Sequence, residues 1–148
     1  MSVSGSTEIR TYTASDQDCV IDLWRSIFPD APAHNDPVLD IHRKLTVQPG
    51  LFLVALRGKD LVGTCMGGFD GHRGWAHYVA VQPEFRRQGI ASHLMRELET
   101  RLLKLGCPKL NLQVRDTAPE AALFYEHLGY SIEKRTSMGK LLGASTDT

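Results

Sequence analysis

The residues best suited to chemistry in this chain form a short basic loop, Arg86-Arg87-Gln88-Gly89, between an apolar run and an amphipathic one. The first turn of a helix leaves backbone N–H donors without partners, and the helix dipole places partial positive charge there. A glycine lets the backbone approach a bulky anion, and arginines add charge and donors suited to phosphate oxygens. The loop therefore predicts a site for an anion such as a diphosphate at a helix N-terminus. The alternative is an ordinary strand-to-helix junction with a solvated arginine pair.

The composition is that of a globular chain. Its 148 residues suffice for one domain with a core, and 42% are apolar and 23% charged. The 17 basic and 17 acidic residues cancel, which argues against a nucleic-acid-binding surface. No apolar run reaches membrane-spanning length and the first residues show no signal-peptide core, so we expect a cytoplasmic location. The three scattered cysteines predict free thiols rather than disulfides or a zinc site.

Hydrophobic spacing predicts the elements that precede the basic loop. We expect a strand at 8–12, a helix that ends before Pro29, and a loop at 28–35. Asn35 or Asp36 can cap a second helix whose first position is Pro37. Apolar residues at helical spacing are expected to be buried, namely Val20, Leu23, Trp24 and Ile27 in the first helix and Val38, Ile41 and Leu45 in the second.

Three antiparallel strands are expected next, joined by turns at 57–60 and 70–74 and spanning 51–56, 61–69 and 75–81. A helix should cover 89–105, with an apolar stripe of Ala91, Leu94, Leu98, Leu102 and Leu105. After it we expect a strand at 109–115, a helix with a capping box of Thr117 and Glu120, and an extended region at 130–142.

This order, β-α-α-β-β-β-α-β-α-β, predicts an α/β (α+β) fold: a mixed sheet with helices on both faces. The strands around the helix at 89–105 should form a parallel, right-handed crossover. We expect a disordered lead at 1–7, a single domain at 8–142 and a flexible tail at 143–148.

Two stretches resemble the GCN5-related N-acetyltransferase (GNAT) family. Arg86-Arg87-Gln88-Gly89-Ile90-Ala91 is similar to the family's acyl-CoA signature, Arg/Gln-x-x-Gly-x-Gly/Ala. Phe124-Tyr125-Glu126-His127-Leu128-Gly129-Tyr130 is similar to its second landmark, Phe-Tyr-x-x-Leu-Gly-Phe/Tyr. With the order of elements, the resemblance covers about 8 to 130 and implies the GNAT fold, with six to seven strands and four helices. Within the family, the stretches 35–37, 51–55 and 66–74 resemble the YpeA-type bacterial acetyltransferases.

The resemblance implies a site for an acyl-CoA donor where the fourth and fifth strands splay apart. The pantetheine arm would pair with the backbone of Val79, Ala80 and Val81, and an N–H near Val79 would polarise the acyl carbonyl. Asn111 would hydrogen-bond the arm and Phe124 would pack against it. The diphosphate would be bound by the loop and helix start, which comprise Arg86, Arg87, Gln88, Gly89, Ile90, Ala91 and Ser92.

Two side chains are candidates for proton transfer. Tyr125 resembles the family's general acid for the leaving thiolate, although it can instead be a structural tyrosine. Alternation places Trp75, His77, Val79 and Val81 on one face, where neutral His77 suits a general base. The alternatives are a packed histidine, a bulge that changes its facing, Glu84 as a weaker base, and no dedicated base at all.

Acceptor recognition is expected from the loop between the first two helices and from the turn before the strand at 75–81. The candidates are Asp36 and Asp70, whose carboxylates would attract a cationic amine, and Asp30 and Asp40 lie near the first of them. Capping and turn formation explain Asp36 and Asp70 equally well, and we favour that explanation. The histidines show no metal-ligand spacing, so we predict no metal site.

The sequence thus predicts an N-acetyltransferase that transfers the acetyl group of acetyl-CoA to a primary amine by direct attack in a ternary complex. A non-catalytic acyl-CoA-binding sensor is the alternative, and the presence of Tyr125 argues against it. A chance motif in a nucleotide-binding domain is a third possibility, against which the absence of a Walker lysine counts. The acceptor, a small molecule or a peptide amine, stays open. We expect no nucleic-acid or membrane partner, and either a monomer or a homodimer.

Overall fold

The computed structural model describes residues 6–115 and 117–143, which form two compact units that divide after Gln113. The first unit holds the sheet and helices α1 to α3, and the second holds α4 (Pro119–His127). Most of the predicted lead at 1–7 and tail at 143–148 lies outside the described residues, and the single domain at 8–142 stays a prediction.

The sheet has five strands in the order β1-β2-β3-β4-β5. The first four, β1 (Glu8–Thr11), β2 (Phe52–Arg57), β3 (Asp60–Phe69) and β4 (Gly74–Val81), pair antiparallel with their neighbours. β5 (Leu110–Leu112) pairs parallel with β4, as expected for strands joined by a crossover helix. The mixed sheet predicted from the sequence is therefore confirmed.

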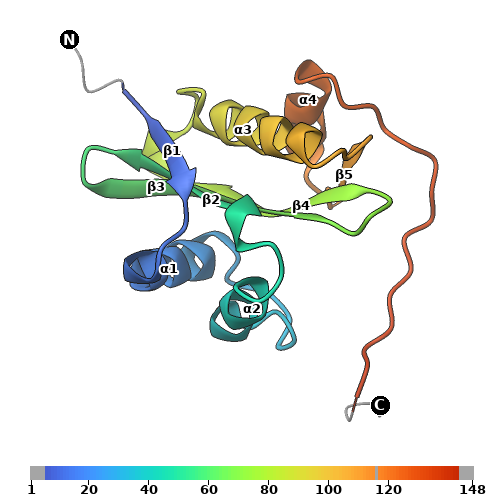
Figure 1. Cartoon of the computed structure of the whole chain (residues 1–148), viewed down its shortest axis with the longest axis horizontal. Coiled ribbons are helices and arrows are strands. Elements are labelled where there is room, and N and C mark those ends of the chain that lie inside the picture. Colours follow the sequence, from blue (N-terminus) through green and yellow to red (C-terminus); the bar gives the residue numbers. More distant parts are fainter. Residues whose placement is uncertain (1–5, 116, 144–148) are drawn as a thin grey trace. The chain divides into compact units, whose positions relative to one another are not determined.

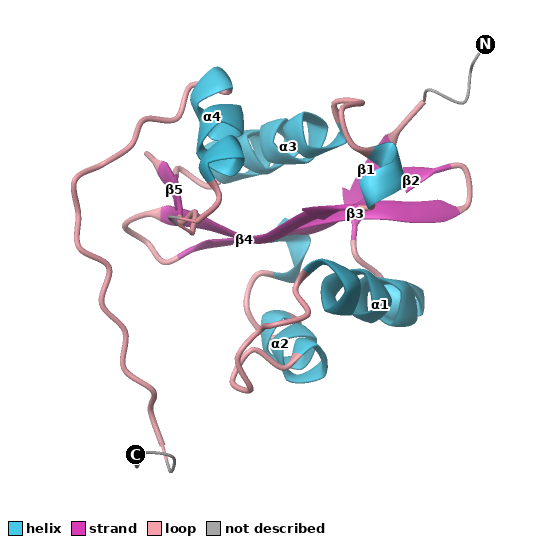
Figure 2. Cartoon of the chain, turned by 180° about the vertical axis from the view of Figure 1, so that it is seen from behind, coloured by secondary structure: helices cyan, strands magenta, loops and turns pink. Residues whose placement is uncertain are grey.

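Helices cover both faces of this sheet. α1 (Gln17–Ile27) and α2 (Pro37–Lys44) lie on one face, and α3 (Ile90–Lys104) lies along the other (Figures 1 and 2). On the α1 face, Trp24 and Ile41 pack in a buried cluster with Phe52 and Val54 of β2. As predicted, Asp36 caps α2, accepting a 3.0 Å hydrogen bond from Val38 N, and Pro37 follows it.

Two glycines of β3 let α3 lie close to the sheet. A Cβ at Gly63 would lie 3.2 Å from Leu94 Cδ1, and a Cβ at Gly67 would overlap with Leu98 Cδ1. Leu94 and Leu98 are fully buried. The absence of side chains at these two positions therefore makes room for the apolar stripe of α3.

The predicted helical stripes are correct in the middle of each helix and at Ile27, which packs against the core at the end of α1, but wrong at the C-terminal ends of α2 and α3. Leu45 is 41% exposed and Leu105 is 52% exposed, because α2 and α3 end one residue earlier and these leucines become C-caps. Lys44, which the sequence analysis did not single out, is buried instead and donates a hydrogen bond to the Gly67 carbonyl of β3. Burial lowers the pKa of its ammonium.

The prediction of six to seven strands is wrong for the described part of the chain, where residues 130–142 form no strand. Their apolar residues do not alternate, and Ile132 is 72% exposed and Met138 90% exposed, so no face is formed for a strand to bury. The predicted capping box of Thr117 is also wrong. Pro119 occupies the first position of α4, so Ala118 is the N-cap.

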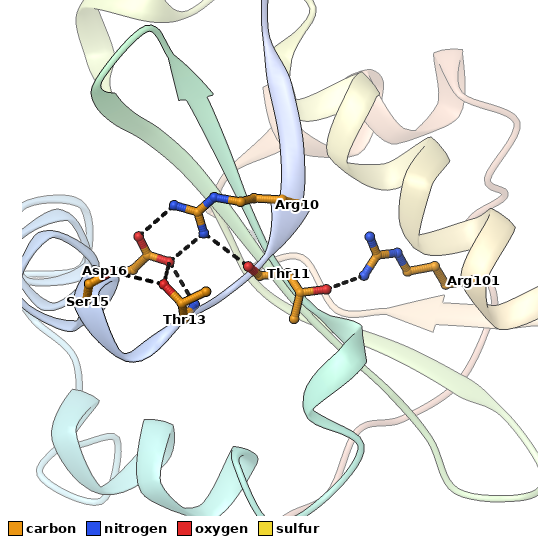
Figure 3. A network of polar contacts seen from close by, with 6 residues as sticks. All are labelled: Arg10, Thr11, Thr13, Ser15, Asp16 and Arg101. Atoms are coloured by element: carbon orange, nitrogen blue, oxygen red, sulfur yellow. Dashed lines mark hydrogen bonds and ion pairs between the residues drawn. The ribbon is translucent and has the colours of Figure 1, made fainter.

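A polar network connects the end of β1 to α1 and α3 (Figure 3). Arg10 donates two hydrogen bonds to Asp16, of 2.8 and 3.0 Å, and Thr13 N donates to the same carboxylate at 2.8 Å. Arg101 of α3 donates to Thr11 Oγ1 at 2.7 Å. Burial alone would raise the pKa of Asp16, but the hydrogen bonds from Arg10 and Thr13 and the charge of Arg10 together lower it.

We expect Asp16→Asn to lower the free energy of unfolding at pH 7 by about 1 to 3 kcal/mol, because the substitution breaks a nearly buried ion pair. Since the pKa of Asp16 is depressed in the folded state, its contribution is complete above the unfolded value of about 3.9 and disappears as the pH falls through the folded value. Urea unfolding of both proteins at pH 7 and pH 3 measures this. A difference in stability that is equal at both pH values would contradict it.

Candidate active site

The second half of β4 has no strand beside it on the β5 side among the described residues. Pairing between the two strands covers Gly74 to Ala76 on β4 and all of β5, Leu110 to Leu112. From His77 to Val81, β4 continues beyond its pairing with β5. These backbone groups are thus available to a bound extended chain. This agrees with the splayed strands that the family resemblance implies.

A β-bulge interrupts β4 at the point where the two strands separate. Thr64 of β3 pairs with Ala80, but Met66 pairs with His77, so Tyr78 and Val79 together oppose the single residue Cys65. Tyr78 has a positive φ of 51°, which is uncommon for a residue with a bulky side chain. The Thr64 hydroxyl stabilises the bulge, because it donates a 2.8 Å hydrogen bond to the Tyr78 carbonyl.

The bulge overturns the expected facing of β4. Trp75 and His77 share a face as predicted, with rings nearly parallel and 6.4 Å apart. Tyr78 and Ala80 instead pack with the cluster on the α1 face, so alternation places Val79 and Val81 on the opposite one. The extra residue in β4 shifts every later side chain by one position.

Tyr78 occupies a site that the sequence analysis did not identify. Its ring stacks on Trp24 of α1, with centroids 3.7 Å apart, and its hydroxyl donates a 2.5 Å hydrogen bond to Asp40 of α2. Burial, the bond to Asp40 and the charges of Asp40 and Asp36 raise the pKa of this phenol. Tyr78 is therefore a neutral hydrogen-bond donor at physiological pH.

The imidazole of His77 lies near charges from α2. The residue is exposed by surface area, yet desolvation by the protein around its ring is the main cause that lowers its pKa. The ammonium of Lys44 lowers that pKa further, and Asp40 opposes the shift. His77 is therefore mostly neutral at pH 7 and can accept a proton.

The basic loop turns sharply at its end and leads directly into α3. Arg87 and Gly89 both have positive φ, at 64° and 79°, and α3 begins directly after them at Ile90. The first helical hydrogen bond runs from His93 N to Gly89 O at 3.0 Å, so the N–H groups of Ile90, Ala91 and Ser92 precede it. Residues 86 to 89 are exposed. A phosphate can thus reach several donors in this turn.

The end of β2 fixes the position of this loop. Arg57 donates a 2.7 Å hydrogen bond to Gln88 Oε1, and its guanidinium lies 5.8 Å from the centroid of the Phe85 ring. Gln88 therefore uses its side chain to hold the loop against the sheet.

The remaining candidates in the first unit have structural partners. Asn111 lies on β5 opposite Trp75. Asp70 accepts hydrogen bonds from His72 N and Arg73 N, both at 2.7 Å, and these bonds lower its pKa. These bonds favour a role for Asp70 in forming the turn rather than in binding an acceptor. The helix cap favours a structural role for Asp36 in the same way.

A cavity of about 290 Å³ lies on the α1 face beside the bulge. It is lined by the end of α1, the loop that follows, Pro37 of α2 and Tyr78. Asp36 is among the lining residues, whereas Asp70 is not. One of the two segments expected to bind an acceptor thus lines a cavity.

Phe124 and Tyr125 belong to α4 in the second unit. Their ring centroids are 4.9 Å apart, and Tyr125 also meets the ring of Tyr130 at 5.9 Å. Tyr130 N donates a 3.0 Å hydrogen bond to the Tyr125 carbonyl, so the residues that follow α4 are bonded back to its last turn. These contacts order the aromatic group within its own unit.

Comparison with known families decides the class. Residues 17–130 match the model of the acetyltransferase (GNAT) family. The chain belongs to this family. It is also similar to acetyltransferases of Pectobacterium atrosepticum and Yersinia enterocolitica, at 44% and 45% identity. Each match covers 91% of this chain and 95% of the relative. This GNAT member is therefore an acyl-CoA-dependent N-acetyltransferase.

Solved structures show the same fold. Ard1 from Thermoplasma volcanium has a TM-score of 0.74 at 25% identity, covering 86% of this chain and 84% of that one. The aminoglycoside acetyltransferase AAC(6')-Iy, in complex with a bisubstrate analogue, has a TM-score of 0.79 at 14% identity, covering 93% and 99%. The GNAT fold predicted from the sequence is confirmed. None of the helices in the described residues is long and apolar enough to cross a membrane.

In this acetyltransferase, sequence reasoning missed Tyr78 and Lys44 and gave Asp40 no role of its own. A bulge leaves no signal in an alternating pattern, so Tyr78 could not be assigned to a face. The lysine at position 44 follows Ile41 at helical spacing, and only the polar partner on β3 makes its burial tolerable.

We expect Gly89→Leu to weaken acetyl-CoA binding by more than about tenfold, because a side chain is strained at a φ of 79° and would disturb the turn donors. Gly106→Leu is the matched control, since Gly106 also has positive φ and open space but lies past the other end of α3. Calorimetric titration of both variants makes the comparison. Equal affinities in the two variants would remove the loop from the donor site.

Proposed function

We propose that this chain transfers the acetyl group of acetyl-CoA to a primary amine by direct attack within a ternary complex. The observation that carries the proposal is the continuity of two features. The half of β4 that has no neighbour on the β5 side among the described residues ends at Val81, and a short turn at Pro83–Phe85 leads from it into the basic loop that begins α3. This order fits a donor with an extended arm, which can pair with β4, and a diphosphate, which can bind at the start of α3.

In this proposal the donor is recognised along its length. The diphosphate contacts the turn from Arg86 to Ser92, and the pantetheine arm pairs with the backbone of Val79, Ala80 and Val81. Asn111, on the neighbouring β5, hydrogen-bonds the arm, and Phe124 packs against it, as the family resemblance implies. The N–H near Val79 polarises the acyl carbonyl, because it lies beside the bulge where the ladder is interrupted.

The proposed reaction forms one bond and breaks one. The nitrogen of a neutral amine attacks the thioester carbon, giving a tetrahedral intermediate whose oxyanion accepts a hydrogen bond from the backbone. The carbon–sulfur bond then breaks, Tyr125 donates a proton to the leaving thiolate, and the new amide nitrogen loses a proton to His77 or to water. The products are an N-acetylamine and CoA.

A non-catalytic acyl-CoA sensor would use the same donor site without turnover. His77 is neutral at pH 7 and lies next to the bulge, which favours the enzyme. The narrower YpeA-type resemblance stays a prediction. A cytoplasmic location is also proposed, since all three cysteines are free thiols.

Two measurements on the purified protein test the proposal. Calorimetry should give micromolar binding of acetyl-CoA, with ATP as the control nucleotide, and a thiol assay should detect CoA release when amines are added. Binding without CoA release from a broad set of amines would favour the sensor. A folded protein that binds no acetyl-CoA would refute the proposal.

We expect Tyr125→Phe to lower kcat by about a hundredfold while the Kd for acetyl-CoA stays unchanged, since the substitution removes the proposed proton donor and keeps the ring. Tyr130→Phe is the control, because Tyr130 lies in ring contact with Tyr125 but has no proposed catalytic role. Steady-state kinetics of the two variants provide the comparison. An unchanged kcat in Tyr125→Phe would show that another group protonates the thiolate.

We also expect the pH profile of kcat/KM of the wild type to show an inflection below 6.5, before the further rise that follows deprotonation of the amine, because the pKa of His77 is lowered and only its neutral form accepts a proton. His77→Gln should lower kcat/KM by about a hundredfold and remove this inflection. His42→Gln, on the exposed side of α2, should change neither. If the inflection persists in His77→Gln, the proton acceptor is a different group.

A further inference from the structure

The cavity beside Tyr78 is small, and its wall is made of both apolar and polar groups. Its volume of about 290 Å³ lies at the lower limit for sites that hold drug-sized ligands. Trp24 and Phe28 contribute aromatic surface, and Pro29, Pro32 and Pro37 contribute stiff apolar surface. A compact molecule with an apolar part fits this space better than a long polymer or a large polycation.

One part of the cavity is negative. Asp36 uses Oδ1 to accept the cap hydrogen bond from Val38 N, and among the described residues no donor reaches its Oδ2. The charge of Asp36 acts on the Tyr78 phenol, so this carboxylate lies toward the β4 side of the cavity. Asp40 is outside the lining and already binds the Tyr78 hydroxyl and Arg43. A protonated amine is therefore attracted to the side of the cavity that adjoins Val79.

The cavity also carries a positive group. Arg25, on the last turn of α1, lines it and is exposed. In the described residues the ion pairs involve Arg10, Arg43 and Arg101, and none involves Arg25. A guanidinium without an acidic partner can bind a carboxylate through two parallel hydrogen bonds.

From this combination we infer that the acceptor is an apolar α-amino acid. Its ammonium is recruited by Asp36, its carboxylate is bound by Arg25, and its side chain packs between Trp24, Phe28 and the prolines. The inference rests on the proposed function, because it names the acceptor of the same transfer. It also gives Asp36 a second role beside the helix cap.

The location suits the chemistry. Tyr78 lines the cavity and directly precedes Val79, whose N–H is proposed to polarise the acyl carbonyl. The cavity therefore adjoins the residue that carries the proposed oxyanion donor. The ammonium must lose a proton before it attacks, and His77 is adjacent to Tyr78 on the same strand.

The test compares amino acids with their amides, which keep the amine and the side chain but lack the carboxylate. L-leucine, L-phenylalanine and L-methionine are each paired with the corresponding amide, and CoA release is measured with saturating acetyl-CoA. We expect kcat/KM for at least one amino acid to exceed that of its amide by about tenfold or more, the range of a charge-assisted hydrogen bond.

Two variants separate the roles of the charges. Arg25→Gln should lower kcat/KM for the preferred amino acid about tenfold and leave its amide unchanged, which removes the discrimination. Asp36→Asn keeps a capping side chain and should lower kcat/KM for the amino acid and the amide equally. Arg96→Gln, an exposed arginine on the other face of the sheet, is the matched charge control and should change neither.

The outcomes distinguish this inference from the proposed function. Binding of acetyl-CoA and turnover of amides or simple amines, without preference for any amino acid, would overturn the inference and leave the proposed function standing. Discrimination that survives in Arg25→Gln would also overturn it. If the protein binds no acetyl-CoA at all, both fall together.

Discussion

The interruption of β4 is the constraint on which the rest of the site depends. Two residues of β4 face one residue of β3, and the chain accommodates them by placing Tyr78 in a left-handed conformation. Thr64 holds the two sides of this irregularity together, because its hydroxyl accepts a 2.9 Å bond from Trp24 Nε1 and donates to the Tyr78 carbonyl. The same irregularity presents Tyr78 to α1 and α2 and reverses the facing of Val79, so that one backbone distortion defines both the proposed acceptor cavity and the proposed oxyanion donor.

Most of the fold follows from local patterns that the sequence states clearly. The run at 51–56, the turn before Asp60 and the second turn at Asp70 predict the antiparallel strands, and the structure has them within a residue or two. Pro37 after Asp36 marks the start of α2 in the same way. The errors arise where a boundary depends on tertiary partners. Leu45 and Leu105 continue a helical spacing but follow the last helical turn, and residues 130–142 form no strand because their apolar side chains are exposed and do not alternate.

The site residues, like the elements of the fold, can be predicted where they depend on local sequence and not where they depend on distant contacts. The sequence predicts the loop from Arg86 to Gly89, because its chemistry depends on backbone donors and a glycine that lie in a single stretch. It does not predict the roles of Tyr78, Lys44 and Arg25, since each of them depends on contacts with other parts of the chain. Tyr78 depends on a register shift, Lys44 on a carbonyl of β3, and Arg25 on a cavity formed by a loop that follows it. The spacing of apolar residues predicts which face of a helix or strand a residue lies on, but not which residues of other elements it contacts.

Gly63 and Gly67 of β3 allow α3 to pack closely on the sheet, and this packing constrains how the enzyme can evolve. α3 carries the proposed diphosphate site at its start, and β4 carries the proposed thioester site, so the relative position of these two parts of the donor site depends on how α3 packs on the sheet. That packing is set by leucines that fill the room above two glycines. The alignment of the two proposed donor sites therefore depends on core residues with no polar chemistry. Drift in this part of the core would shift the proposed diphosphate site relative to the proposed thioester site while every donor-binding residue stayed the same.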